Sequence, residues 1–239
     1  MGKYSFVLSD ALYKQYYLFK THQNYDKEII SHLLKFYTGE FLTNVRQLVN
    51  IGVDKEVSPS LHISLYKAGF RQQSLEELAE KTDYKLILSL DDNVDFPYVS
   101  IMSDPISSYI VGCYYRDTPR DKACMHIKSL CKGAKKVCLY DKYLNQSTDI
   151  LKLFLPRKEM EVIYHPDQLA MSDIIALGTY CPQWSFRRNN SLLTHHDRYI
   201  IIDDKMEIIL SSGFMYLGRT MKELTYIVRP VLGNRLVKC

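Results

Sequence analysis

The chain has 239 residues, of which 46% are hydrophobic and 24% are charged, and this is the composition of one or two ordinary folded domains. It contains only 10 glycines and 8 prolines, which excludes a low-complexity chain, and its formal net charge of +4 permits nucleic-acid binding without requiring it. No run of apolar residues is long enough to cross a membrane, and the first residues do not resemble a secretory signal. We therefore expect a cytoplasmic protein without a transmembrane segment.

The first 117 residues mix strand and helix signals and predict an α+β region that carries no catalytic motif. Strands are expected over residues 3–8, 85–90 and 98–102. Helices are expected over residues 26–37 and 41–50. A looser segment around Pro59 follows them, and a third helix is expected after it. That third helix is expected to begin at Ser74, because Ser74 and Glu77 form a capping-box pattern.

Residues 118–239 predict an α/β layer. A helix is expected from Thr118 to Gly133, followed by a strand over 136–140, a helix over 147–154 and a strand over 161–164. This alternation with short connections favours neighbouring parallel strands. Further strands are expected on both sides of an acidic hairpin at residues 203–205, and a last strand over 224–228.

His196, Arg198 and Asp203 form the most informative pattern, H-x-R-x4-D. On an extended strand His196 and Arg198 project to the same face, because side chains alternate with a period of two. An imidazole beside a fixed cation suits attack on a phosphodiester, since the ring can attack phosphorus while the guanidinium neutralises the oxygens. The alternative is a chance match within an ordinary buried strand.

This pattern resembles the H-x-K-x4-D motif of the phospholipase D superfamily. Ser211, Ser212 and Gly213 stand where that superfamily has its G-S-x-N stretch, and Asp141-x-Tyr143 resembles a feature of single-motif members. The sequence is especially similar to the C-terminal branch of MIT proteins and to related bacterial domains. The resemblance covers residues 118–235 and implies a mixed sheet flanked by helices.

The resemblance also implies roles for these residues and a metal-free mechanism without a cofactor. His196 would form a covalent phosphohistidine, Arg198 would clamp the phosphate, and Asp203 would orient a histidine. Ser211 and Ser212 would hydrogen-bond phosphate oxygens. Such a mechanism needs two histidines and the chain supplies one motif, so the resemblance predicts a homodimer in which two copies of His196 face each other.

Trp184, Arg187 and Arg188 precede the motif and interleave aromatic with cationic side chains. We interpret them as a loop that stacks on bases and binds phosphates, which favours nucleic acid as substrate. The structural alternative is a solvated loop with Trp184 packed inward.

The leading hypothesis is a nuclease, and similar small bacterial proteins suggest a place in antiviral defence. A rival hypothesis is a non-catalytic module that binds nucleic acid, anionic lipid or a protein partner, because Arg198 replaces the usual lysine and the Asn of G-S-x-N is missing. A third is that residues 1–117 carry the function, as a sensor or as a dock for another protein.

Overall fold

The computed structural model describes residues 4–36, 40–92, 95–104, 106–107, 111–146, 148–190 and 198–231. The chain divides into two compact units between residues 108 and 109. This division comes before the one expected at 117/118, because β6 (Val111–Tyr114) pairs with β12 (Leu224–Pro230) and so belongs to the C-terminal sheet. His196 and Asp197 lie outside the described residues.

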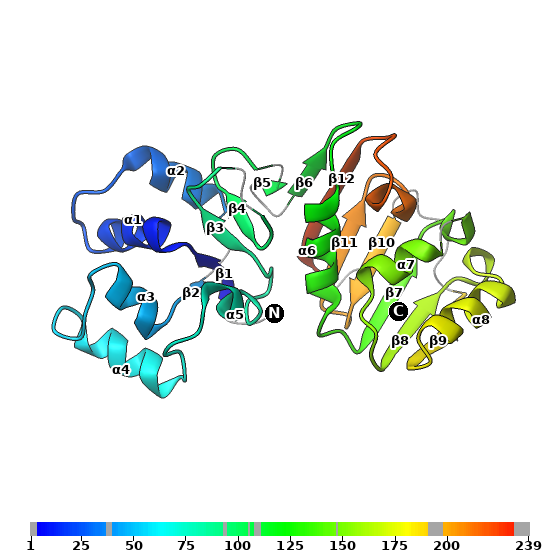
Figure 1. Ribbon diagram of the computed structural model, residues 1–239, viewed down its shortest axis with the longest axis horizontal. Helices are drawn as coiled ribbons and strands as arrows, with labels where there is room; N and C mark the ends of the chain where they lie inside the picture. The colour runs from blue at the N-terminus through cyan, green and yellow to red at the C-terminus, as the bar shows by residue number, and fades with distance from the viewer. Residues whose placement is uncertain are drawn as a thin grey trace. The chain divides into compact units, whose positions relative to one another are not determined.

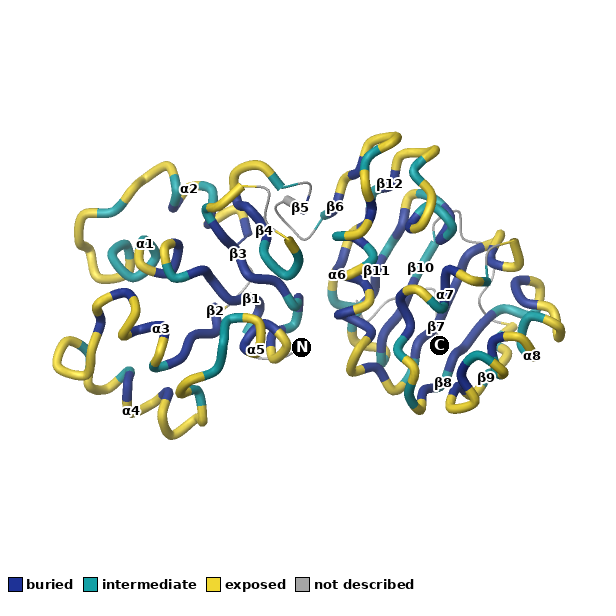
Figure 2. Tube along the Cα trace, in the orientation of Figure 1, coloured by how far each residue is buried: buried dark blue, intermediate teal, exposed yellow. Residues whose placement is uncertain are grey.

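The N-terminal unit contains a four-stranded sheet in the order β2-β1-β3-β4, in which every pairing is parallel (Figure 1). Its strands are β1 (Tyr4–Leu8), β2 (Glu40–Leu42), β3 (Ile87–Ser89) and β4 (Tyr98–Ser100). Its helices are α1 (Asp10–Lys20), α2 (Lys27–Lys35), α3 (Val45–Asn50), α4 (Pro59–Lys67) and α5 (Leu75–Ala79). The central strands β1 and β3 are buried along most of their length (Figure 2), as expected where helices cover a parallel sheet.

Three differences from the sequence prediction appear in this unit. The helix expected over 41–50 begins only at Val45, because Phe41 and Leu42 pair with β1 and Asn44 caps the helix by accepting the backbone N–H of Gln47. Helices α1 and α4 were not predicted. The capping box at Ser74 is confirmed.

The C-terminal unit is an α/β structure with a mixed sheet, whose strands within this unit follow the order β6-β12-β11-β10-β7-β8-β9. The short strand β5 (Ile106–Ser107) comes before the division of the chain. The remaining strands of the C-terminal unit are β7 (Lys136–Tyr140), β8 (Met160–Tyr164), β9 (Trp184–Arg188), β10 (Arg198–Ile202) and β11 (Met206–Leu210). The helices are α6 (Asp121–Cys131), α7 (Asp149–Phe154) and α8 (Met171–Tyr180), with short 3-10 turns η1 (Leu144–Gln146), η2 (Pro166–Gln168) and η3 (Phe214–Leu217).

The strand directions confirm the expected topology of this half. Strands β7, β8 and β9 run parallel and are connected through α7 and α8, whereas β10 and β11 form the expected antiparallel hairpin. In Figure 1, α6 and α7 lie over one face of the sheet. The strands β7, β8, β10 and β11 form the buried centre of the unit (Figure 2) because their side chains are apolar on both faces.

Within the described part of the chain, no helix is both long enough and apolar enough to span a membrane.

Candidate functional site

One edge of the C-terminal sheet collects polar residues from several strand ends. Asp141 follows the last residue of β7, Arg198 is the first residue of β10, and Ser211 follows the last residue of β11. The pairing of Tyr199 with Tyr140 brings the start of β10 level with the end of β7. The register of the sheet therefore gathers these three residues from positions far apart in the sequence.

Arg198 is held beside a buried carboxylate. Its Nε lies 3.8 Å from Oδ1 of Asp141, and its Nη1 donates a hydrogen bond to the carbonyl oxygen of Ser211 at 3.3 Å. The side chain of Asp141 is 2% exposed, whereas that of Arg198 is 22% exposed. The guanidinium is thus fixed from the protein side while part of it stays accessible at the sheet edge.

Asp141 also connects two turns of the backbone. Its Oδ1 accepts the N–H of Tyr143 at 3.1 Å, and its Oδ2 accepts the N–H of Phe214 at 2.6 Å. A Cβ at position 213 would lie 3.2 Å from Oδ2, so glycine at this position allows the close approach. Asp141 therefore ties the start of η3 to the end of β7 and balances the charge of Arg198. The D-x-Y pattern pointed to this residue, but we did not include it in the predicted site.

Asp203 has a structural role in the β10–β11 hairpin, and the orienting role expected for it stays a prediction, because His196 lies outside the described residues. Asp203 follows the last residue of β10, whereas Arg198 is the first, so the two are separated by about 16 Å along the strand. Its Oδ1 accepts the backbone N–H groups of Lys135 and Lys136 at 2.9 and 2.8 Å. The residue has a positive φ of 51°, which suits the turn of the β10–β11 hairpin. The carboxylate anchors that hairpin to the start of β7.

The two predicted phosphate-binding serines differ in what their hydroxyls do. Ser212 Oγ donates to the carbonyl oxygen of Glu223 at 2.8 Å, so its proton is already used. Ser211 Oγ accepts the N–H of Thr225 at 2.9 Å, and its side chain is exposed. A hydroxyl that accepts one bond retains its own proton for donation, so Ser211 is the better candidate for contact with a phosphate.

The segment that contains Trp184, Arg187 and Arg188 is strand β9 and not the loop that we expected. Trp184 is 5% exposed, its Nε1 donates to the carbonyl oxygen of Pro156 at 2.9 Å, and its ring packs 5.7 Å from that of Tyr180. Because this indole is buried and bonded, it is not available to stack on a base. This arrangement favours the structural alternative, in which Trp184 packs inward.

The two arginines of β9 differ in their partners. Arg187 Nε donates to Oε1 of Glu161 at 2.7 Å, which neutralises its charge locally. Arg188 is exposed and its Nε donates to the neutral hydroxyl of Tyr164 at 3.3 Å. Arg188 is the last residue of β9, which lies three strands, or about 14 Å, from β10 in the sheet order. It therefore places a second positive charge at the same edge of the sheet as Arg198.

Three further residues at this edge lie outside the site that the sequence predicted. Lys142 and Tyr143 follow Asp141, both are exposed, and Lys142 Nζ lies 5.9 Å from the centroid of the Tyr143 ring. His165 follows β8, and its Nδ1 accepts the N–H of Asp167 at 3.3 Å. The D-x-Y pattern pointed to Tyr143, and the signal for the other two residues was their position directly after a buried strand, where the carboxyl ends of parallel strands commonly carry ligand contacts.

Among the residues that the structure describes, no three histidine, cysteine or carboxylate side chains converge in a way that could hold a metal ion.

No protein-family model matches this chain, and no curated protein matches it. Among solved structures, this chain has weak similarity to a phospholipase D family member, Nuc from Salmonella typhimurium. The two are 16% identical, with 49% of this chain and 80% of Nuc covered and a TM-score of 0.32.

NucT from Helicobacter pylori is 14% identical, over 49% of this chain and 84% of NucT, with a TM-score of 0.35. TrmBL2, an archaeal chromatin protein, is 11% identical, over 50% of this chain and 45% of TrmBL2, with a TM-score of 0.27. None of these similarities is strong enough to assign a function to this chain.

Proposed function

We propose that the C-terminal unit is a phosphodiesterase that cleaves nucleic acid without a metal ion. The observation that carries the proposal is the ion pair between Arg198 and Asp141, which fixes a partly exposed guanidinium two residues after His196. A preorganised cation stabilises the charge that develops on phosphate oxygens in the transition state without having to reorganise. Ser211 and Arg188 supply further contacts to the substrate backbone at the same edge.

In this proposal His196 attacks phosphorus and forms a phosphohistidine, as the resemblance to the phospholipase D superfamily implies. The leaving oxygen takes a proton from a second imidazole, and that imidazole then activates the water that releases the phosphate. We propose that the second imidazole is His196 of another subunit in a two-fold homodimer. A role in antiviral defence is a prediction that the sequence resemblance alone carries.

The test is cleavage of labelled single- and double-stranded DNA and RNA in excess EDTA by the full chain. Wild type is expected to cleave at least one substrate, His196→Ala to be inactive, and Arg198→Gln to lose about 100-fold or more in kcat/KM. His195→Ala is the matched control, because it removes the neighbouring imidazole and is expected to stay active. Cleavage that survives in His196→Ala would contradict the mechanism.

The dimer has its own test. Sedimentation velocity is expected to show a dimer at concentrations at which the protein is active. An active monomer that loses activity on His165→Ala would instead place the second imidazole at the end of β8 of the same chain, and the homodimer proposal would be wrong.

A non-catalytic binding module is the second candidate, because Asp141 and the Ser211 carbonyl both engage the guanidinium of Arg198. It predicts no cleavage by wild type or by His196→Ala, together with binding of one substrate that is lost in Arg198→Gln. The same substrates and variants therefore separate the two candidates.

A further inference from the structure

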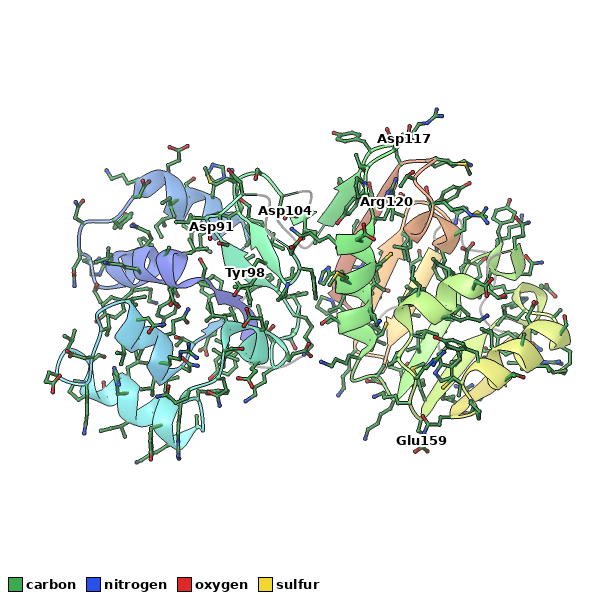
Figure 3. All side chains as sticks on the ribbon, viewed as in Figure 1. Asp91, Tyr98, Asp104, Asp117, Arg120 and Glu159 are labelled. Atoms are coloured by element: carbon green, nitrogen blue, oxygen red, sulfur yellow. The ribbon has the colours of Figure 1, made fainter. Side chains whose placement is uncertain are left out.

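A cavity of about 400 Å³ lies in the N-terminal unit beside helix α4, whose side chains project outward from this unit (Figure 3). Its lining comes from the start of α3, the α3–α4 connection and α4, and consists of Val45, Lys55, His62, Ile63, Tyr66 and Lys67. The volume falls in the range of small-molecule sites, which combine an apolar lining with a few polar groups. None of these residues belongs to the proposed phosphodiesterase site, so the cavity needs an explanation of its own.

His62 is the buried polar residue of this lining. It is 7% exposed, and its Nε2 lies 2.8 Å from the carbonyl oxygen of Val53. A carbonyl oxygen only accepts, so Nε2 donates and carries the proton of the neutral ring, which leaves a lone pair on Nδ1. Nδ1 has no hydrogen-bond partner among the described residues, and it is not sealed from solvent. Because His62 lines the cavity, we infer that this acceptor opens into it.

The open Nδ1 of His62 sets a requirement on any ligand of the cavity. A solvent-accessible acceptor can bond to water, so a ligand that takes the place of the solvent must offer it a donor. A ligand without an N–H or O–H at this point would leave Nδ1 unpaired, which costs affinity. The cavity therefore selects for a molecule whose apolar body carries one hydrogen-bond donor.

The charged residues of the lining are both lysines. Lys55 and Lys67 are exposed, and neither forms an ion pair among the residues that the structure describes. Arg71 adds a third positive charge nearby, since its guanidinium lies 3.8 Å from the centroid of the Tyr66 ring. Asp54 precedes Lys55, but it does not line the cavity and its Oδ1 accepts the N–H of Val57. The cavity therefore favours a ligand with a negative charge.

The rest of the lining is apolar and partly uncovered. Ile63 and Tyr66 are 47% and 55% exposed, and their spacing of three residues places them side by side on one face of α4. Val45 adds an aliphatic side chain from α3. A flat ring in the cavity would cover both exposed side chains of α4 and so remove apolar surface from water. The lining suits an aromatic body joined to an anionic group.

We propose that this cavity binds a small aromatic carboxylate that carries a ring N–H or O–H. Its ring lies against Ile63 and Tyr66, its donor bonds to Nδ1 of His62, and its carboxylate pairs with Lys55 and Lys67. The site belongs to the N-terminal unit alone, and the proposal holds whether or not the protein cleaves nucleic acid.

The experiment is a ligand-observed NMR titration of the full chain with four probes of similar size. Indole-3-acetate carries both the anion and the ring N–H, and it is expected to saturate the protein with a Kd of about 1 mM or below. Indole-3-acetamide removes the charge and tryptamine reverses it, so each should bind at least about fivefold more weakly. 1-Naphthaleneacetate keeps the charge but lacks the N–H, so it should bind at least about threefold more weakly.

Variants of exposed residues test the charge and the apolar wall without disturbing the buried core. The double variant Lys55→Gln with Lys67→Gln is expected to weaken indole-3-acetate at least about fivefold and to leave indole-3-acetamide almost unchanged. Ile63→Glu places a carboxylate in the wall and should weaken indole-3-acetate at least about tenfold. Lys14→Gln is the charge control, because Lys14 is exposed in the same unit and does not line the cavity, and it is expected to change nothing.

His62→Gln tests the hydrogen bond. It is expected to remove the preference for indole-3-acetate over 1-naphthaleneacetate, because the acceptor Nδ1 is lost. The thermal midpoint checks that this variant folds, and the two probes compared on wild type test the same contact without any substitution.

Four results would overturn the proposal. They are no saturable binding of indole-3-acetate up to about 10 mM, equal affinity for all four probes, binding that Ile63→Glu leaves intact, and binding that Arg198→Gln abolishes. The last would place the probe at the proposed catalytic edge.

Discussion

The carboxylate of Asp141 lies 3.8 Å from Nε of Arg198, although the two residues belong to different strands and are 57 positions apart in the chain. The aspartate is buried and the arginine is partly exposed, so one partner fixes the position of the other. This pair is the centre of the proposed site, and its loss should affect both stability and substrate binding.

We expect Asp141→Asn to destabilise the protein by about 1–3 kcal/mol. An amide offers one oxygen where the carboxylate offers two, so one of the N–H groups of Tyr143 and Phe214 loses its acceptor. The thermal midpoint of the C-terminal unit measures the change. Asp117→Asn is the matched control, because the side chain of Asp117 is 72% exposed, and an equal shift in both variants would contradict the assigned role.

Replacement of Asp203 separates a structural role from a catalytic one. Asp203→Ala removes two charged hydrogen bonds and places alanine at a positive φ, so we expect a loss of about 2–4 kcal/mol. Asp203→Asn keeps one side-chain oxygen as an acceptor, and asparagine tolerates a positive φ, so this variant should lose less stability than Asp203→Ala. Activity per folded molecule, measured well below the unfolding midpoint, is expected to stay close to that of wild type in both variants. A loss of kcat in a fully folded Asp203→Asn protein would support the orienting role.

The two arginines of β9 should contribute unequally to nucleic-acid binding. We expect Arg188→Gln to weaken binding and to lower the slope of log K against log salt by about one, as the loss of one phosphate contact does. Arg187→Gln should change the slope less, because Glu161 already pairs with this side chain. Fluorescence anisotropy over a series of salt concentrations provides the comparison. Equal slopes in the two variants would show that pairing with Glu161 does not weaken the contact of Arg187 with the phosphates.

Trp184 provides a probe because it is the single tryptophan of the chain. The indole of Trp184 is buried against Tyr180 and donates a hydrogen bond to the carbonyl oxygen of Pro156. Acrylamide should therefore quench its emission weakly in the folded protein and strongly after denaturation. Saturating nucleic acid should leave the emission almost unchanged. Strong quenching on addition of nucleic acid would return Trp184 to the list of substrate contacts.

The raised pKa values of two cysteine thiols predict how the stability of the folded protein changes at alkaline pH. Burial raises the pKa of Cys131 from 9.0 to about 12 and that of Cys124 to about 11. The folded state therefore favours the neutral thiols, and this contribution is complete below pH 9 and is lost as the pH rises through 11 and 12. Thermal midpoints measured from neutral pH into this window should fall more steeply for wild type than for Cys131→Ala. Parallel profiles would show that Cys131 does not contribute to the loss.

Local patterns predicted those parts of the fold whose structure depends on neighbours in the sequence. The capping box at Ser74, the strand Lys136–Tyr140 and the hairpin between β10 and β11 appear in the structure as expected. Each is set by a short-range interaction or by an apolar run that is long enough to recognise. Strand β9 was not predicted, because the alternation of aromatic and charged residues in Trp184–Arg188 is also typical of an exposed loop.

The candidate site also has features that the local sequence predicts and features that depend on contacts between distant segments. The sequence by itself determined that a histidine and an arginine stand two residues apart at the start of an apolar run, and that an aspartate follows that run. Only the tertiary structure decided which carboxylate accompanies Arg198. The antiparallel register of β10 against β7 brings Asp141 to its side and carries Asp203 to the far end of the strand. Spacing along one strand fixes which face a side chain occupies, whereas hydrogen bonds between strands decide which residues of other segments it meets.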